Sequence, residues 1–167
     1  MCRVHIFGEL IYERGLKERG YKTTIEHARH YIDTQQITGK NIGEIRHNQR
    51  AFQEAVLDMQ IAQEARLPPG EIIFLDRALP DALAYYRFLN FPPHEKLTQA
   101  LRNVYYRKIF ILDLLPLALD YARTEDAEAQ KRIQQLLTEV YESLPFPVVH
   151  VPVLSQGERV DFILKHL

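Results

Sequence analysis

The sequence predicts an α/β domain of three layers, α/β/α, built around a mostly parallel sheet of five strands. Short apolar segments alternate along the chain with stretches whose apolar residues recur every three or four positions. Three of the segments, Ile-Ile-Phe-Leu, Ile-Phe-Ile-Leu and Val-Val-His-Val, are nearly continuous in apolar residues, as strands covered by helices on both faces require. This alternation of strand and helix favours parallel strands joined by helical crossovers.

The expected elements fill most of the chain. The expected strands cover residues 3–7, 21–25, 71–76, 108–113 and 147–153. The expected helices cover residues 10–19, 26–35, 42–66, 80–88, 95–105, 126–143 and 158–167. The longest helix ends before Pro68, Pro69 and Gly70, because proline cannot continue a helix. No repeat, low-complexity tract or linker interrupts the pattern, so residues 1–167 are expected to form one domain.

Composition narrows the class of protein. A length of 167 residues with 46% hydrophobic and 26% charged residues is typical of one globular domain. The net charge is −1 and both signs are spread along the chain, so we expect no nucleic-acid partner and no membrane surface. Cys2 is the single cysteine, which excludes an internal disulfide and a cysteine-based zinc site. No apolar run approaches the ~20 residues of a membrane span and no secretory h-region is present, so a cytoplasmic location is expected.

The strongest chemical signal is Asp76-Arg77 directly after a buried strand. In parallel α/β sheets, ligands bind beyond the carboxyl ends of the strands. A carboxylate there serves Mg²⁺ or accepts a proton from a hydroxyl, and a guanidinium holds phosphate or carboxylate through two bonds. The alternative of equal weight is that Asp76 caps the following helix and Arg77 is solvated.

Five segments, in their order along the chain, resemble a known family. They are Glu-Arg-Gly-Tyr-Lys-Thr (18–23), Glu-His-Ala-Arg-His-Tyr (26–31), Leu-Asp-Arg-Ala-Leu-Pro-Asp-Ala-Leu-Ala-Tyr-Tyr (75–86), Asp-Tyr-Ala-Arg-Thr-Glu (120–125) and Val-Pro-Val followed by Glu-Arg-Val-Asp-Phe-Ile (151–163). The pattern resembles the AAA-type P-loop domain related to NadR-like nicotinamide riboside kinases and the wider nucleoside and nucleotide kinase group. The resemblance implies a P-loop NTPase fold, ATP and Mg²⁺ as cofactors, and a nucleotide or nucleoside-like ligand.

The resemblance also implies roles for particular residues. Asp76 would be the catalytic carboxylate and the Mg²⁺ ligand. The other implied contacts are Glu26, Arg29, Arg77 and Asp81 for the acceptor substrate, and Arg123 in a lid over the phosphates, with Arg102 and Arg107 as further lid arginines. For Glu26 and Arg29 the alternative is a first-turn acid beside a surface arginine. For Asp120, Arg123 and Glu125 it is an exposed ion cluster, and for Arg102 and Arg107 it is a surface position.

One part of the family pattern is missing. The family begins with a strand, G-x-x-x-x-G-K-[ST] and a helix, in which backbone N–H groups and the lysine hold phosphates. Here the first expected strand leads into Gly8-Glu-Leu-Ile-Tyr-Glu-Arg14, and Gly39-Lys40-Asn41 follows a helix rather than a strand. Two interpretations stay open: a divergent pseudo-enzyme, or an original N-terminus that has been lost or replaced. Both predict impaired triphosphate binding.

Two other groups of residues are weaker candidates for a site. His27 and His30 lie three apart beside Glu26, a spacing compatible with a metal pair but more typical of solvated histidines. Together with Asp76 they define a third, less favoured hypothesis, a metal-dependent hydrolase. The aromatic residues of the second half resemble a nucleobase-stacking set but are more typical of a core: Tyr85, Tyr86, Phe88, Phe91, Tyr105 and Tyr106.

The sequence therefore supports two principal functional hypotheses. The first is an ATP-binding P-loop NTPase or small-molecule kinase domain whose phosphoryl transfer is weak or absent. The second is a non-catalytic binding or assembly module with the same fold. Enzymatic activity and homo-oligomerisation both stay open.

Overall fold

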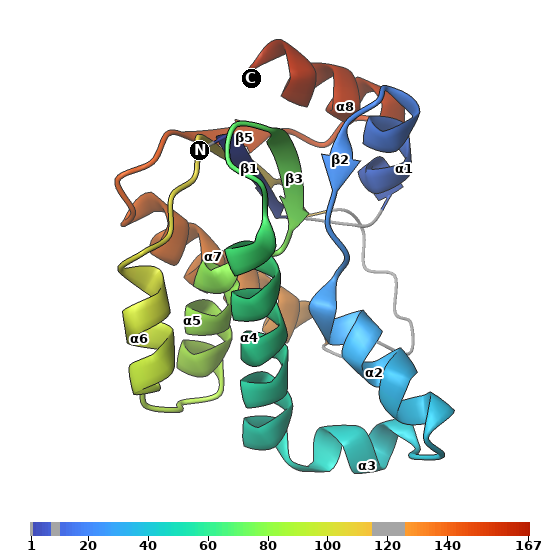
Figure 1. Cartoon of the computed structure of the whole chain (residues 1–167), viewed down its shortest axis with the longest axis vertical. Coiled ribbons are helices and arrows are strands. Elements are labelled where there is room, and N and C mark those ends of the chain that lie inside the picture. Colours follow the sequence, from blue (N-terminus) through green and yellow to red (C-terminus); the bar gives the residue numbers. More distant parts are fainter. Residues whose placement is uncertain (1, 8–10, 115–125) are drawn as a thin grey trace.

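The computed structural model describes residues 2–7, 11–114 and 126–167, and it has a parallel sheet between two layers of helices (Figure 1). The strands are β1 (Cys2–Phe7), β2 (Lys22–Thr23), β3 (Ile72–Asp76), β4 (Lys108–Leu112) and β5 (Val148–Val151). The helices are α1 (Ile11–Glu18), α2 (His27–Ile37), α3 (Ile42–His47), α4 (Gln49–Arg66), α5 (Leu79–Phe88), α6 (Glu95–Leu101), α7 (Ala127–Glu142) and α8 (Gln156–Lys165).

The sheet confirms the predicted fold class. Its strand order is β2-β3-β1-β4-β5, and every pair of neighbours is parallel. β1 lies at the centre, where Ile6 pairs with Asp76 of β3 and with Phe110 of β4. Because all strands run the same way, their carboxyl ends meet at one edge of the sheet. The chain moves to one side of β1 for β2 and β3 and to the other side for β4 and β5, which is the arrangement that opens a crevice at such an edge.

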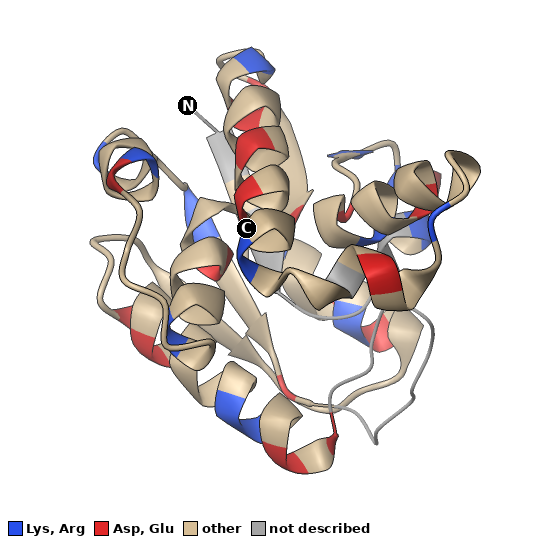
Figure 2. Cartoon of the chain, turned by 90° about the horizontal axis from the view of Figure 1, so that it is seen from below, with Lys and Arg blue, Asp and Glu red and all other residues tan. Residues whose placement is uncertain are grey.

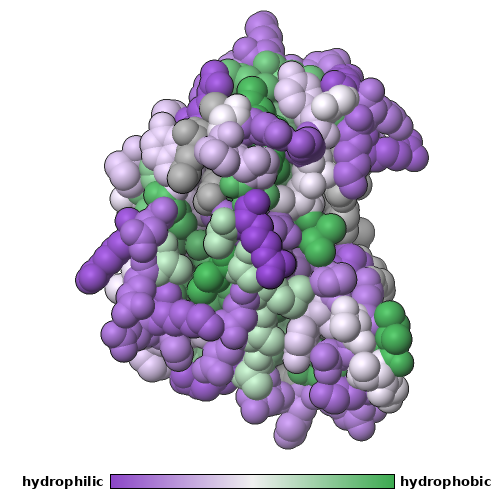
Figure 3. Space-filling model, viewed as in Figure 1, coloured by the Kyte–Doolittle hydropathy of each residue, from purple (hydrophilic) through white to green (hydrophobic). Residues whose placement is uncertain are grey.

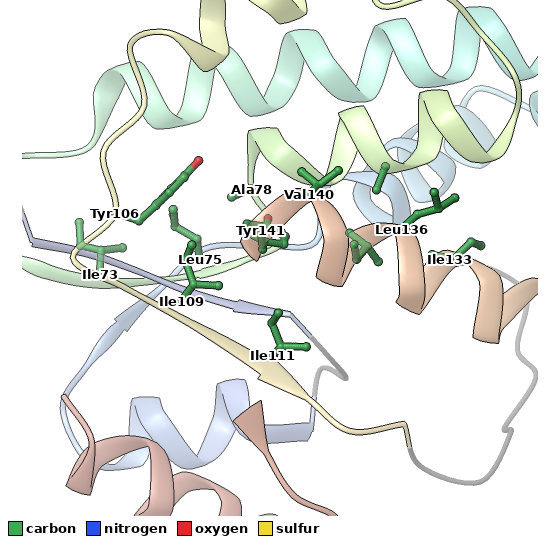
Figure 4. Packing of buried hydrophobic residues seen from close by; sticks show 12 residues of the cluster. Ile73, Leu75, Ala78, Tyr106, Ile109, Ile111, Ile133, Leu136, Val140 and Tyr141 are labelled. Carbon is green, nitrogen blue, oxygen red and sulfur yellow. The ribbon is translucent and has the colours of Figure 1, made fainter. Parts of the chain in front are cut away.

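Alternate residues of β3 and β4 pack against different helix layers. On one face, Ile73 and Leu75 of β3 and Ile109 and Ile111 of β4 belong to a buried cluster with α5 and α7, most of which Figure 4 shows. On the other face, Phe74 and its neighbours pack against side chains of α1 and α8. The nearly continuous apolar character of these strands is therefore explained by burial on both faces.

α2, α3 and α4 form an arm that extends away from the sheet (Figure 1). Its own core includes Ile32, Val56 and Phe52, and Tyr31 makes an edge-to-face contact with Phe52 at 5.6 Å between ring centroids. The single helix predicted for residues 42–66 is wrong, because the chain breaks at Asn48. The side chain of Asn48 accepts a hydrogen bond from the N–H of Ala51 at 3.1 Å and so begins α4 as a cap.

A smaller difference concerns α6, which ends at Leu101 instead of continuing to residue 105. Tyr106 is only 1% exposed, so the chain leaves the helix early enough to direct this side chain into the core before β4 begins.

The face of the molecule in Figure 3 is mainly hydrophilic, with smaller hydrophobic areas. Among the described residues, no helix combines the length and apolarity needed to cross a membrane.

The arm offers a test with two isoleucines of the same helix. Ile32 is fully buried, whereas Ile37 is 87% exposed. We expect Ile32→Ala to lower the free energy of unfolding by about 2–5 kcal/mol, because it leaves a cavity between α2 and α4. Ile37→Ala, the matched control, should change it by no more than about 0.5 kcal/mol. Urea denaturation followed by circular dichroism measures both, and equal effects would contradict the packing of α2.

Candidate functional site

Polar side chains meet at the carboxyl ends of β2 and β3. Thr24, one residue past β2, continues the strand pairing through its N–H, which donates to the carbonyl of Phe74 at 2.9 Å. Its hydroxyl accepts a hydrogen bond from the N–H of Asp76 at 3.1 Å. Thr24 and Asp76 are 6% and 5% exposed, so the hydrogen bond that fixes the end of β3 is buried.

Arg77 has a backbone conformation that is rare for its residue type. Its φ of 62° lies in the left-handed region, which side chains with a Cβ adopt at a cost of about 1–3 kcal/mol. The turn directs the guanidinium to two partners. Nε lies 3.2 Å from Oε1 of Glu26, and Nη1 donates to the hydroxyl of Tyr85 at 2.7 Å. Strain of this kind persists where surrounding contacts fix it, and it is commonly found at binding sites.

Glu26 connects two arginines. It precedes α2 at the N-cap, and its Oε2 accepts a hydrogen bond from Nε of Arg29 at 3.3 Å while Oε1 pairs with Arg77. The three side chains are only 10–19% exposed. Burial acts to lower the pKa of Arg77, but Tyr85, Glu26 and Asp81 together raise this pKa well above its usual value. The edge of the sheet therefore holds a permanent guanidinium whose charge is balanced by carboxylates.

The beginning of α5 is held by buried side chains from three other parts of the fold. Glu64 of α4 accepts a hydrogen bond from the N–H of Leu79 at 3.0 Å, and Asp81 accepts one from the N–H of Ala78 at 2.7 Å. The hydroxyl of Tyr106 donates to Glu64, and the hydroxyl of Tyr141 on α7 donates to Asp81. Sequence reasoning missed Glu64 and Tyr141, and it considered Tyr106 only as a member of a possible stacking set. A recurrence of polar residues on the buried face of α4, at Gln53, Gln60 and Glu64, was the available signal.

The end of β4 has polar contacts of its own. Gln134 of α7 donates to the carbonyl of Leu112 at 3.1 Å, and Arg159 of α8 donates to the carbonyl of Asp113 at 3.1 Å. Arg159 is 4% exposed, so its guanidinium connects α8 to this strand end inside the protein.

The structure brings together some of the predicted site residues and separates others. Asp76, Glu26, Arg29 and Arg77 lie at one edge, within the contacts described above. Asp81 is 2% exposed and is bound to Ala78 and Tyr141, so it lies behind the turn rather than on the surface.

Two of the predicted lid arginines, Arg102 and Arg107, do not join this edge. Arg107 directly precedes β4 and so lies at the opposite, amino end of the sheet, and Arg102 caps the end of α6. Both are exposed. Arg123, with Asp120 and Glu125, lies outside the described residues.

The structure also shows where several of the aromatic residues and the two histidines singled out from the sequence lie. Tyr86 and Tyr106 are fully buried and belong to the core, whereas Tyr85 contacts Arg77. His27 is 3% exposed and His30 is exposed, so the two do not form one surface pair. No group of three potential metal-binding side chains occurs in the part of the chain that the structure describes. Gly39 and Lys40 connect α2 to α3, as the sequence indicated.

The charges around the site are mixed. Figure 2, which views the molecule from below, shows acidic and basic residues interspersed over the described helices. The site at the edge of the sheet is therefore distinguished by specific, partly buried ion pairs rather than by a field of one sign.

The strand order and the layers are those of the P-loop kinase-like NTPases. The family model described as AAA domain matches residues 12–159. The chain belongs to this family. No curated protein sequence matches it.

Solved structures agree on the fold. Deoxyadenosine kinase from M. mycoides with bound dATP is 14% identical with a TM-score of 0.63, and the match covers 98% of each chain. A NadR protein in complex with NR is 15% identical with a TM-score of 0.62, covering 98% of this chain and 51% of that one, about half its length. Thymidylate kinase from Candida albicans is 12% identical with a TM-score of 0.57, covering 99% and 90%. The fold is thus that of nucleoside and nucleotide kinases.

His27 makes the stability of the site region depend on pH. Burial lowers the pKa of His27 below its usual value, and His30 acts in the same direction, while the hydrogen bond to Gln63 and the charge of Glu26 oppose the change. The folded protein therefore binds this proton less readily than the unfolded chain. As the pH falls below about 6.5, the unfolded chain gains the proton first and the folded state loses stability.

We expect His27→Gln to reduce the loss of stability between pH 7.5 and pH 5.5, as measured by urea denaturation at several pH values. His47→Gln, at the exposed end of α3, is the control and should keep the slope of the wild type. An unchanged slope in the His27 variant would contradict this assignment.

Proposed function

We propose that the chain binds a small nucleoside or nucleotide at the carboxyl edge of β2 and β3. Asp76, Glu26, Arg29 and Arg77 make this contact. The observation that carries the proposal is the left-handed turn at Arg77, which holds a guanidinium between Glu26 and Tyr85 beside the buried carboxylate of Asp76. Membership of the AAA-domain family and the kinase fold support it.

The chemistry of these groups suits a ligand with hydroxyl and phosphate groups. A sugar hydroxyl donates to a carboxylate such as Glu26 or Asp76, whereas the guanidinium groups of Arg29 and Arg77 donate to phosphate oxygens. The deoxyadenosine kinase and NadR structures were determined with dATP and with NR, which are ligands of this kind.

The cofactors of the family fit this chain unequally. Mg²⁺ needs only one or two carboxylates when phosphates and water complete its shell, and Asp76 at the end of β3 supplies one such oxygen donor. When bound, Mg²⁺ would neutralise phosphate charge. A triphosphate fits poorly, because no Gly-Lys-Ser or Gly-Lys-Thr occurs in the 167 residues and the segment after the first strand carries Glu9 and Glu13. We therefore propose weak or absent ATP turnover by this chain.

The alternative is a non-catalytic binding or assembly module with the same fold. The missing lysine favours it, whereas the ion pairs that join Glu26, Arg29 and Arg77 favour a site that still binds a ligand. The two proposals differ in whether a small molecule stabilises the folded protein.

A ligand screen tests the principal proposal. We expect at least one compound among adenosine, deoxyadenosine, nicotinamide riboside, AMP, dATP and NAD, with and without Mg²⁺, to raise the melting temperature. A ligand at 100 times its Kd adds about 2.7 kcal/mol to the stability of the native state. Arg77→Lys should weaken this ligand by about tenfold or more, because lysine lacks the planar fork of donors. Arg102→Lys, the matched control on the surface, should bind as the wild type does. If no compound shifts the melting temperature, the binding or assembly module is the better interpretation.

Isothermal titration with Mg-ATP tests the missing phosphate loop. We expect no binding in the micromolar range, because the chain offers no lysine and no glycine-rich segment of the required spacing. Micromolar affinity for Mg-ATP would refute this prediction.

A further inference from the structure

We propose that Glu64 and Asp81 are positioning residues. By accepting hydrogen bonds from the backbone N–H groups of Ala78 and Leu79, they hold the Asp76–Arg77 turn in the conformation that binds the ligand. The proposal deepens the proposed function, on which it rests, and it assigns to Asp81 a role inside the protein instead of a contact with substrate.

The backbone after Arg77 is bound at consecutive residues. Ala78 donates its N–H to Oδ2 of Asp81, and Leu79 donates its N–H to Oε1 of Glu64. The carbonyl of Ala78 accepts a weaker hydrogen bond from Nε2 of Gln60 at 3.4 Å. Three backbone groups that follow the left-handed residue are therefore fixed by side chains, two of them from α4.

The two carboxylates are themselves held by tyrosines from the other side. The hydroxyl of Tyr106 lies 3.2 and 3.1 Å from the two oxygens of Glu64, and the hydroxyl of Tyr141 donates to Asp81. Burial raises the pKa of Tyr141 well above its usual value, and the nearby charges of Asp81 and Glu64 act in the same direction, so this hydroxyl stays a donor. Figure 4 shows Ala78 among Tyr106, Tyr141 and Leu75.

Burial of the carboxyl groups of Glu64 and Asp81 requires compensating hydrogen bonds. Asp81 and Glu64 are 2% and 4% exposed, and removing charges of this kind from water is costly. Apolar residues at these positions would avoid the cost of removing charge from water. Apolar residues, however, offer no acceptor for the N–H groups of Ala78 and Leu79. The hydrogen bonds from these two N–H groups are the contacts that hold the backbone after the strained Arg77. The carboxylates also contribute charge, since Asp81 helps to raise the pKa of Arg77.

The experiment removes one tyrosine hydroxyl at a time. The variants are Tyr141→Phe and Tyr106→Phe. The matched control is Tyr86→Phe, because Tyr86 is equally buried and its hydroxyl has no hydrogen-bond partner among the described residues. The first measurement is the Nε–Hε signal of Arg77 in a ¹H–¹⁵N NMR spectrum of the protein without ligand, assigned by its loss in Arg77→Lys. The second is the Kd for AMP, and the third is the free energy of unfolding in urea.

We expect the Arg77 signal to shift or broaden in Tyr141→Phe and Tyr106→Phe and to stay unchanged in Tyr86→Phe. The Kd for AMP should rise about tenfold in the first two, as for the loss of one hydrogen bond to a charged group. A loss of stability with an unmoved Arg77 signal would show a purely structural role and overturn the proposal. If Tyr141→Phe does not fold, Asp81→Asn replaces it and the same criteria apply. Should AMP fail to bind the wild type, the proposed ligand class is wrong, while the Arg77 signal still decides the positioning role.

Discussion

The candidate site depends on one backbone conformation, the left-handed Arg77 at the end of β3. A residue with a Cβ adopts this conformation at a cost of about 1–3 kcal/mol, a noticeable part of the 5–15 kcal/mol by which domains are stable. The surrounding hydrogen bonds offset the cost. Thr24 fixes the residue before Arg77, and Asp81 and Glu64 fix the two residues after it. A glycine would adopt the turn without strain, but it would supply no guanidinium.

Electrostatic balance explains why so much charge is tolerated at this edge. Glu26 neutralises part of the charge of Arg29 and Arg77, and all three are largely withdrawn from water. Exposed ion pairs contribute about 0–1 kcal/mol, whereas removing one partner of a buried pair leaves an uncompensated charge at a far higher cost. In the proposed binding site, a phosphate or a hydroxyl of the ligand would satisfy the guanidinium groups or the carboxylate in place of their present contacts.

The fold also explains why the similar solved structures share one architecture although their ligands differ. A parallel sheet with the order β2-β3-β1-β4-β5 places the ends of β2 and β3 side by side, whatever the ligand. The segments after these strands then decide the chemistry, as at any strand edge of this type. In this chain those segments supply acids and arginines, whereas the sequence after the first strand does not supply a phosphate-binding lysine.

The sequence by itself determined the fold class, all five strands and the position of Asp76 and Arg77 at the edge. The apolar runs of β3 and β4 are unambiguous, since burial on both faces leaves no room for polar residues, and Asp76-Arg77 follows β3 with no intervening residue. Helix boundaries were less certain, because a cap such as Asn48 interrupts a continuous apolar periodicity between α3 and α4 without a proline or glycine.

Only the tertiary structure decided which side chains bind the backbone that follows Arg77 and which tyrosines bind those side chains. Glu64, Asp81, Tyr106 and Tyr141 come from α4, α5, the approach to β4 and α7, so no local spacing connects them. Arg102 and Arg107 show the converse, since the direction of the strand takes Arg107 to the opposite edge of the sheet. Periodicity reports which face of an element is buried, whereas the partners of a buried polar group are set by the packing of distant elements.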